Sequence, residues 1–161
     1  MTLNHRFVGL AIAFGCTSLV LSIGASLTDL GPWYQALKQP SWKPPDAAFG
    51  IIWSTIFTLC AFSGWGAWQA SKTSTQKLRI AFLFALNGLL NILWSFLYFN
   101  QQRPDWAMME LYFLWGSVLV LMIGLWRLSK LSSVMLLPYL VWVTAAGFLN
   151  AATIELNGPF S

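Results

Sequence analysis

Residues 78–99 read LRIAFLFALNGLLNILWSFLYF, and this stretch decides the fold class of the chain. Its residues are mostly apolar, with one basic residue, Arg79, near the start and two amides, Asn87 and Asn91, further along. A helix needs about 20 mostly apolar residues, each adding about 1.5 Å, to cross the hydrocarbon layer of a membrane. The stretch therefore predicts a transmembrane helix.

Four further stretches have the same length and apolar character, and each is bounded by charged, proline or polar residues. They are residues 7–27, 47–70, 106–128 and 134–156. Of the 161 residues, 57% are hydrophobic and 9% are charged, whereas about a quarter of the residues in soluble domains are charged. We predict an all-α fold, with residues 1–161 forming a single membrane domain that is a bundle of five transmembrane helices.

The first span has a second interpretation, as a cleavable signal peptide. Arg6 precedes its apolar run, and small residues follow at positions 24–26, as at a cleavage site. Cleavage would leave four helices. The apolar run is about 20 residues long, however, whereas the core of a signal peptide has about 7 to 15 residues, so we favour a retained transmembrane helix.

The basic residues predict the orientation of the bundle, because Lys and Arg collect in cytoplasmic loops. If the helices alternate in direction, the basic residues divide unequally between the two sides. One side receives Arg6, Lys72, Lys77, Arg79, Arg127 and Lys130, and the other receives Lys38, Lys43 and Arg103. We therefore expect a cytoplasmic N-terminus and a C-terminus outside the cytoplasm. The basic residues occur in ones and twos, without a run that could follow a phosphate backbone, so we expect no nucleic-acid partner.

Residues 29–46 form the longest connection, and several prolines should stiffen it. Its apolar side chains should hold it against the bundle or in the headgroup layer of the membrane. These side chains are Trp33, Tyr34, Leu37 and Trp42. An interfacial anchor and a lid over a pocket both agree with this pattern, and the residues alone do not separate the two.

Several aromatic and amide side chains should lie at one depth, in the half of the membrane nearest to this connection. Counting from the helix ends places Trp53, Asn91, Trp94, Tyr98 and Trp106 there, and in the last span Trp142, Ala146, Leu149 and Asn150 share one helical face. Amides in hydrocarbon need hydrogen-bond partners, so the three span asparagines should point into the bundle. They could bond neighbouring helices or a ligand, and the tryptophans could fill gaps or line a flat slot.

The residues offer little ordinary catalytic or metal-binding chemistry. His5 is the only histidine, and Cys16 and Cys60 lie alone in apolar segments. Glu110 and Glu155 lie near helix ends on separate segments. We therefore expect no metal site, no catalytic triad and no pair of catalytic carboxylates.

Three groups of motifs follow one another along nearly the whole chain. They are Trp33-Tyr34 with Leu37, Pro40, Trp42, Pro44-Pro45, Phe49 and Trp53, then Asn91-x-x-Trp94 with Trp106-Ala107, and last Pro138-Tyr139-Leu140-x-Trp142 with Ala146, Leu149-Asn150 and Leu156-Asn157. In this order and spacing the motifs are highly specific. The chain resembles the tryptophan-rich sensory protein or translocator protein family (TspO/MBR), also called the peripheral benzodiazepine receptor family.

This resemblance implies a five-helix bundle, often a homodimer, that binds tetrapyrroles such as protoporphyrin IX and haem, with no covalently bound cofactor. In animal relatives it also implies cholesterol and benzodiazepine-type ligands. The pocket would lie beneath the first loop, with Trp53 and Trp142 as aromatic walls and Asn91 as a polar contact. The other implied site residues are Trp33, Tyr34 and Trp42 in the lid, with Phe49, Asn87, Trp94, Trp106, Ala146, Leu149 and Asn150 around the cavity.

The chain departs from the family pattern at a few positions. Phe57 replaces a usual tyrosine, Asn87 replaces a glutamine found in many relatives, and Phe96 replaces a frequent proline. The animal cholesterol motif needs a tyrosine and then a basic residue after Asn150, whereas this chain continues with residues 151–155, AATIE. We therefore do not expect cholesterol recognition by that route.

Three functions follow from these observations. The first is a receptor or carrier that binds tetrapyrroles and has a sensory or regulatory role in porphyrin handling. The second, implied by some bacterial relatives, is light-dependent porphyrin degradation, in which Trp53 and Trp142 would take part. The third is a small transporter, although no paired intramembrane charges or broken helices are evident. Small residues that would permit a close dimer contact are Gly9, Ala13, Gly64, Gly116 and Gly124.

Overall fold

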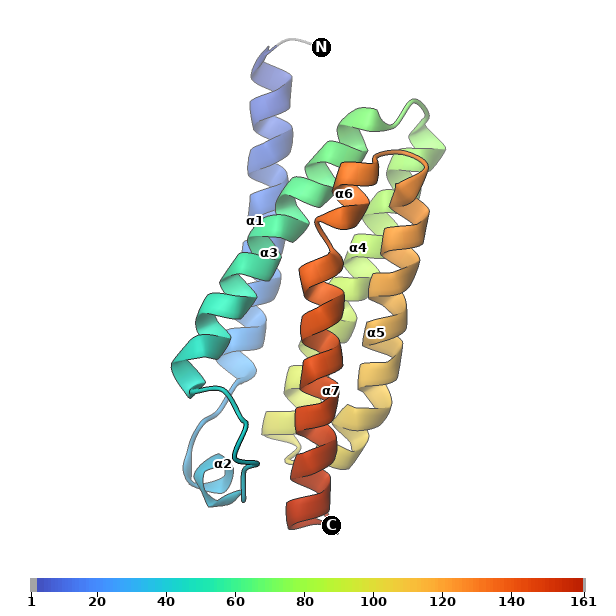
Figure 1. Ribbon diagram of the computed structural model, residues 1–161. Coiled ribbons are helices and arrows are strands. Elements are labelled where there is room, and N and C mark those ends of the chain that lie inside the picture. Colours follow the sequence, from blue (N-terminus) through green and yellow to red (C-terminus); the bar gives the residue numbers. More distant parts are fainter. Residues whose placement is uncertain (1–2, 161) are drawn as a thin grey trace.

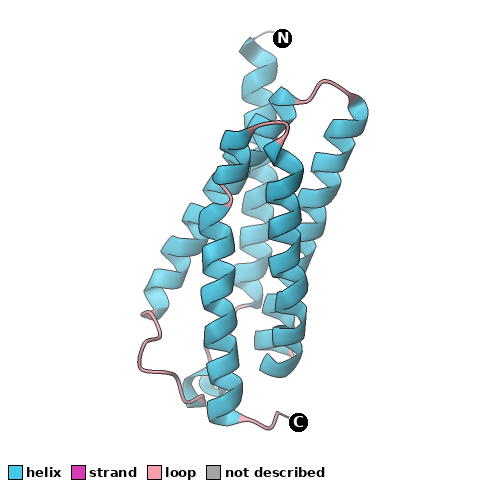
Figure 2. Cartoon of the chain, turned by 45° about the vertical axis from the view of Figure 1, so that its right-hand side comes forward, coloured by secondary structure: helices cyan, strands magenta, loops and turns pink. Residues whose placement is uncertain are grey.

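The computed structural model describes residues 3–160, with side chains from residue 6 onward, and all of its regular structure is helical (Figures 1 and 2). The long helices are α1 (Leu3–Leu27), α3 (Asp46–Ala70), α4 (Ser74–Ser95), α5 (Pro104–Trp126) and α7 (Leu137–Asn157). Three short segments join or extend them: α2 (Pro32–Ala36), the π-helical turn η1 (Phe96–Asn100) and α6 (Lys130–Val134). In these residues five helical segments are long and apolar enough to cross a membrane, which confirms the predicted all-α, five-span fold.

The helix boundaries follow from local sequence chemistry. Pro32, Pro104 and Pro138 lie in the first turns of α2, α5 and α7, where the missing N–H group of proline breaks no hydrogen bond. At the start of α4, Thr73 Oγ1 accepts a hydrogen bond from the backbone N–H of Gln76, whose side chain accepts one from the N–H of Thr73. This capping box begins α4 four residues before the predicted span.

Two other segments contain structure that the sequence did not predict. The third span continues beyond α4 as η1, in which Gln101 N donates to Phe96 O at 3.0 Å. Such a wider turn changes the direction of the side chains that follow it. Residues 129–133, predicted to be a short link, instead contain most of α6, which Ser129 caps by accepting a hydrogen bond from Ser132 N at 3.2 Å.

The long helices form one bundle in which α1 lies against α3 and α4, α4 against α5, and α5 against α7 (Figure 1). At the end near α6 the helices approach very closely. Ser63 Oγ of α3 donates to Ser132 O at 2.7 Å, and a Cβ atom on Gly66 would lie 2.7 Å from Ser132 Oγ. Ser133 Oγ donates to Met122 O of α5 at 2.7 Å, and Leu136 is fully buried. This end of the bundle is therefore solidly filled.

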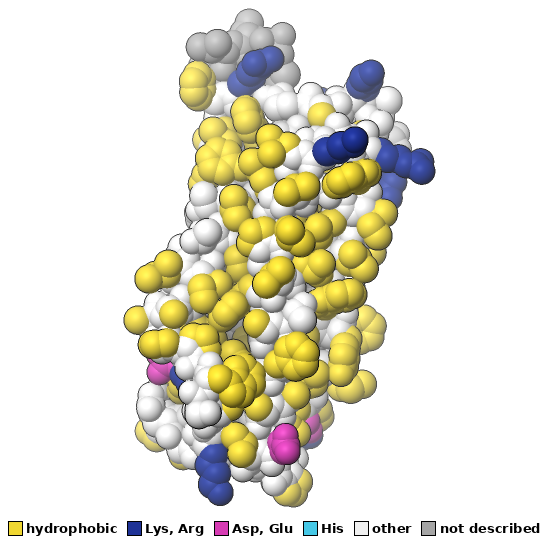
Figure 3. All heavy atoms as spheres, viewed as in Figure 1, with side chains coloured by type: hydrophobic (Ala, Val, Ile, Leu, Met, Phe, Trp, Pro, Cys, Tyr) yellow, Lys and Arg dark blue, Asp and Glu magenta, His cyan; other side chains and the backbone are white. Residues whose placement is uncertain are grey.

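The two ends of the bundle also differ in charge. Basic side chains gather at the end that contains α6, whereas acidic side chains are visible only toward the other end in the view of Figure 3. We call the first the basic end; its residues are Arg6, Lys72, Lys77, Arg79, Arg127 and Lys130. We call the other the lid end, because the connection between α1 and α3 lies there (Figure 1).

Candidate functional site

A cavity of about 280 Å³ lies at the lid end, between α1, α3, α4 and α7. Its walls on the helices are Leu21, Gly24 and Ala25 of α1, Asp46, Phe49, Gly50, Trp53 and Phe57 of α3, Asn91, Trp94 and Ser95 of α4, Phe99 of η1, and Trp142 and Ala146 of α7. Thr28, Leu30 and Tyr34, from the connection between α1 and α3, complete the lining. The connection that the sequence left open as an anchor or a lid therefore supplies part of the cavity wall.

Aromatic rings from two helices hold one another in place around the cavity. Trp53 stacks on Phe57, one helical turn further along α3, with ring centroids 5.7 Å apart. Trp53 also forms a T-shaped pair with Tyr139 of α7, with centroids 5.9 Å apart, and Phe49 forms one with Trp142 at 5.4 Å. Pairs at such distances are favourable beyond the area they bury. The indole rings of Trp53 and Trp142 are therefore fixed from the side and present apolar surface to the cavity.

A third tryptophan, Trp94, is oriented by a buried amide. Its Nε1 donates to Asn150 Oδ1 at 3.3 Å, and Asn150 Nδ2 donates to the backbone carbonyl of Pro104 at 2.7 Å. The ring also stacks on Tyr98 with centroids 5.0 Å apart. Asn150 is only 1% exposed and is absent from the cavity lining, so it acts through Trp94 rather than on a ligand.

Asn91 is the amide that faces the cavity. Its Nδ2 donates to the hydroxyl oxygen of Tyr139 at 3.2 Å, which fixes the orientation of the side chain. The Oδ1 atom lies 3.9 Å from where a Cβ atom on Gly24 of α1 would be, and no donor of the described residues bonds it. An acceptor thus points toward α1, where a ligand N–H group could meet it.

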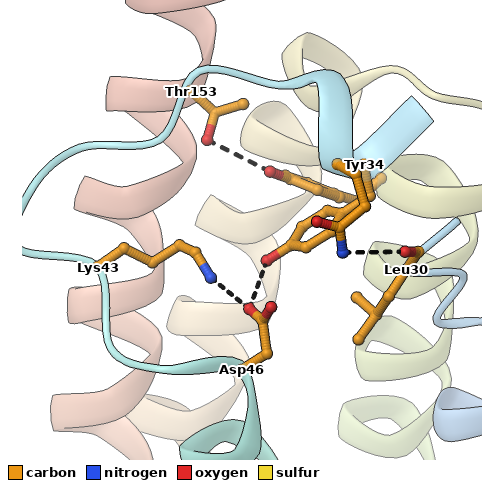
Figure 4. A network of polar contacts seen from close by, with 7 residues as sticks. Leu30, Tyr34, Lys43, Asp46 and Thr153 are labelled. Atoms are coloured by element: carbon orange, nitrogen blue, oxygen red, sulfur yellow. Dashed lines mark hydrogen bonds and ion pairs between the residues drawn. The ribbon is translucent and has the colours of Figure 1, made fainter. Parts of the chain in front are cut away.

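The lid is fastened to α3 by a compact polar network, which Figure 4 shows. The Tyr34 hydroxyl group donates to Asp46 Oδ1 at 3.0 Å, and the Lys43 ammonium group forms an ion pair with the same oxygen. The Lys43 nitrogen also lies 5.5 Å from the ring centres of both Tyr34 and Phe49. We call Tyr34, Lys43 and Asp46 the lid latch.

The latch residues on the lid remain protonated at neutral pH. Burial raises the pKa of the Tyr34 hydroxyl group above its ordinary value of 10.0. Burial acts to lower the pKa of Lys43, but its hydrogen bonds with Asp46 and Tyr34 outweigh this effect and raise the pKa above the ordinary 10.5. Lys43 therefore carries a positive charge next to the carboxylate of Asp46, which lines the cavity.

A second clasp joins the lid to the end of α7. Asn157 Oδ1 accepts a hydrogen bond from Lys38 N at 2.7 Å, and Asn157 Nδ2 donates to Lys38 O at 2.9 Å. Trp33 packs edge-on against Tyr98, with centroids 6.1 Å apart. The lid is thus held to α3, α7 and η1 at once.

Several predicted site residues line the cavity and others do not. Those that line it are Tyr34, Phe49, Trp53, Asn91, Trp94, Trp142 and Ala146. Those that lie outside the lining are Trp33, Trp42, Asn87, Trp106, Leu149 and Asn150.

Each residue outside the lining has a different local role. Trp42 is 55% exposed, and Asn87 Nδ2 donates to Ser117 Oγ of α5 at 2.8 Å, so this amide joins two helices. Trp106 is half exposed beneath the guanidinium group of Arg103, 4.2 Å from its ring centre. The carbonyl of Leu149 accepts a hydrogen bond from Thr153 one turn later.

The sequence pattern did not predict the wall that α1 provides. There the small residues at positions 24–26 suggested a cleavage site, whereas Gly24 and Ala25 leave room beside α4 for the cavity. Gly50 of α3 contributes in the same way, since a Cβ atom there would meet nothing within 4 Å. Small residues facing an aromatic cluster were the available signal for this wall.

The lining provides aromatic surface and a few hydrogen-bonding groups rather than a reactive set. Asp46 is its only acidic residue, and the lid latch already engages it. Glu110 of α5 is buried outside the lining, and neither of its carboxyl oxygens has a hydrogen-bond partner among the described residues. No group of three potential metal ligands occurs among the described residues, and the side chain of His5 lies outside them. The cavity is suited to holding a largely apolar molecule.

Comparison with known proteins gives matches along most of the chain. A family model described as TspO/MBR family matches residues 7–156. Protein CrtK of Rhodobacter capsulatus is 36% identical over 152 residues, which cover 94% of this chain and 89% of the relative. Tryptophan-rich protein TspO of Chlorobaculum tepidum is 31% identical over 165 residues, covering 96% and 99%. The translocator protein of Homo sapiens is 27% identical over 119 residues, covering 73% and 70%.

Proposed function

Because the chain belongs to the TspO/MBR family and is an integral, multi-pass membrane protein, we propose that it binds tetrapyrroles such as protoporphyrin IX or haem in the cavity at the lid end. It would act as a membrane receptor or carrier, with a sensory or regulatory role in porphyrin handling. The observation that carries this proposal is the convergence of Trp53, Trp94 and Trp142 on one cavity beneath the lid.

The lining matches the chemistry of a free-base tetrapyrrole. Indole rings offer apolar faces for a flat macrocycle, and the unused Oδ1 of Asn91 can accept a hydrogen bond from a pyrrole N–H group. The propionate groups of the macrocycle are anionic and would lie toward the lid, where Lys43, paired with Asp46 while the lid is closed, is positive. The polar edge of the ligand would thus face water while its ring is buried.

The size of the cavity makes the lid part of the binding event. Its volume of about 280 Å³ is just below the range of about 300 to 1,000 Å³ that is common for ligand sites. A tetrapyrrole is among the larger ligands, so the lid would have to move outward to admit it. Opening would break the bonds of the lid latch and of Asn157, and binding would have to compensate for their loss.

Titration of the purified protein with protoporphyrin IX tests this proposal. The shift of the porphyrin absorption band should saturate, and Trp53→Leu and Trp142→Leu should each weaken binding about tenfold, because lost ring contacts cost about 0.5 to 1.5 kcal/mol beyond the lost buried area. Trp126→Leu is the matched control, since Trp126 is half exposed near the basic end. Wild-type affinity in both cavity variants would refute the site, and circular dichroism would show that each variant is folded.

The remaining parts of the proposal concern orientation and assembly. We propose that the basic end faces the cytoplasm, in accordance with the distribution of Lys and Arg. We also propose a homodimer, as the family resemblance implies. Three of the small residues considered for a dimer contact already meet neighbours in the same chain: Gly9 meets Trp65, Gly64 meets Phe84, and Gly124 meets Leu83. A dimer would therefore use other positions.

A further inference from the structure

A second hollow, the α4–α5 groove, runs along the outside of the bundle where α4 and α5 lie side by side. Its volume is about 420 Å³. Its apolar walls include Leu83, Leu86 and Leu90 of α4 and Phe113, Gly116 and Val120 of α5. Phe113 is 68% exposed, and a Cβ atom on Gly116 would meet no atom within 4 Å. The groove is therefore an open apolar channel on the face that a membrane would cover.

One basic side chain stands at the end of this groove. Arg79 lies one turn before Leu83 on α4, and spacings of four, seven and eleven residues put Arg79, Leu83, Leu86 and Leu90 on one face. Leu83 Cδ1 and Arg79 Nη2 lie 3.5 and 3.7 Å from the place of a Cβ atom on Gly124 of α5. Because Gly124 has no side chain, the guanidinium group can lie against α5 at the end of the groove nearest to Leu83.

Arg79 is exposed, and its charge is not neutralised within the chain. Among the described residues, no carboxylate lies within ion-pair distance of it. The five acidic residues of the sequence are Asp29, Asp46, Asp105, Glu110 and Glu155, and none of them lies on α4, the helix that carries Arg79. The guanidinium group is therefore free to bind an anion that arrives from outside the chain.

The length of the groove matches one leaflet of a bilayer. Eleven residues separate Arg79 from Leu90, so they span about 16 Å along α4 at about 1.5 Å per residue. Half of a hydrocarbon layer that is about 30 Å thick is about 15 Å. With Arg79 at the level of the headgroups, an acyl chain in the groove would end near the middle of the membrane.

We propose that the α4–α5 groove binds one anionic phospholipid of the leaflet at the basic end, with an acyl chain along the apolar walls and its phosphate on Arg79. Charge favours this occupant over a second copy of the chain. A copy inserted in the same direction would bring its own Arg79 and neighbouring lysines to the same end, without any acid to pair with them. This site is separate from the cavity, and the proposal does not depend on tetrapyrrole binding.

Native mass spectrometry of the purified full chain with equal amounts of phosphatidylglycerol and phosphatidylcholine tests the proposal. The wild-type protein should retain one phosphatidylglycerol in preference to phosphatidylcholine. Arg79→Gln should lower this preference about fivefold, which corresponds to about 1 kcal/mol for one basic residue near a lipid surface. Arg6→Gln is the matched control, because it removes the same charge from the same end but on α1.

A second variant tests the apolar part of the site. Gly116→Leu should lower the retention of both lipids, because the added side chain would occupy the open space over this glycine. Its melting temperature should remain that of the wild type, since the position is open. Equal retention of the two lipids by the wild type, an equal effect of Arg6→Gln, or unchanged retention in Gly116→Leu would each overturn the proposal. Efficient cross-linking of two Gly116→Cys copies would do so as well, by placing a second chain in the groove.

Discussion

Among the single side chains, Asn150 shows how a buried amide can serve the cavity without reaching it. It bonds both the Trp94 ring and the Pro104 carbonyl, which ties α4 and the start of α5 to α7. Hydrogen bonds in membrane proteins contribute only about 0.6 kcal/mol on average. A buried polar group left without its partner costs about 1 to 3 kcal/mol, however, and removal of this amide would leave the indole N–H group of Trp94 without one.

We therefore expect Asn150→Leu, which keeps much of the side-chain volume, to lower the free energy of unfolding by about 2 kcal/mol. Binding of protoporphyrin IX should also weaken, because Trp94 would lose the bond that orients it. Denaturant unfolding in detergent micelles measures the first effect, and absorption titration measures the second. Asn100→Leu provides the comparison, because Asn100 is an exposed residue of η1. Equal stability of the two variants would show that the amide bonds contribute little.

Single residues also show what the sequence could reveal about the site. Trp53, Asn91 and Trp142 were predictable because depth along a helix follows from counting residues. The roles of Asn87 and Asn150 were not predictable from the sequence. A buried amide needs a hydrogen-bond partner, but that partner can be either a neighbouring helix or a ligand. Only the direction of each side chain in the folded protein separates the two cases.

The lid depends on contacts that a linear pattern does not contain. Its prolines and aromatic residues predicted a stiff, apolar segment, but Tyr34 meets Asp46 across 12 positions and Lys38 meets Asn157 across 119. The five spans, in contrast, were predictable because length and apolarity alone determine whether a helix can cross a membrane. The π-helical turn η1 had no signal in the sequence, because its residues continue the apolar run of the third span.

The lid latch should open under alkaline conditions. Lys43 and Tyr34 both have a raised pKa in the folded state, so the stability they contribute is complete below their ordinary values of 10.5 and 10.0 and is lost as pH rises further. A spin label at Ser41→Cys should therefore keep constant mobility from pH 6 to about pH 9 and gain mobility above about pH 10. The label should be placed in a background that lacks Cys16 and Cys60.

Two comparisons make this pH experiment specific. With Lys43→Met, which removes the ion pair with Asp46, the label should already be mobile at neutral pH. A label at Thr75→Cys, an exposed position at the start of α4, should show no transition over the same range. A transition near neutral pH, or the same transition at both positions, would contradict the assignment to the latch.

Across the full bundle, the charge difference between the two ends gives a testable orientation. In intact cells, a membrane-impermeant thiol reagent should label Ser41→Cys in the lid and should not label Thr75→Cys at the start of α4. Both positions are exposed, and they lie at opposite ends of the bundle, so accessibility within the protein does not explain a difference. Disruption of the cells should make both positions reactive. Labelling of Thr75→Cys alone in intact cells would reverse the proposed orientation.

The tight contact of Ser63, Gly66 and Ser132 at the basic end limits how far a bound molecule could move along the bundle. In the described residues the cavity extends no further from the lid than Leu21, Phe57, Asn91 and Trp142, and filled bundle lies beyond them. The cavity is therefore closed toward the basic end of the bundle. Passage of a bound molecule toward the basic end would require the contacts that Ser63 and Ser133 make with neighbouring segments to open.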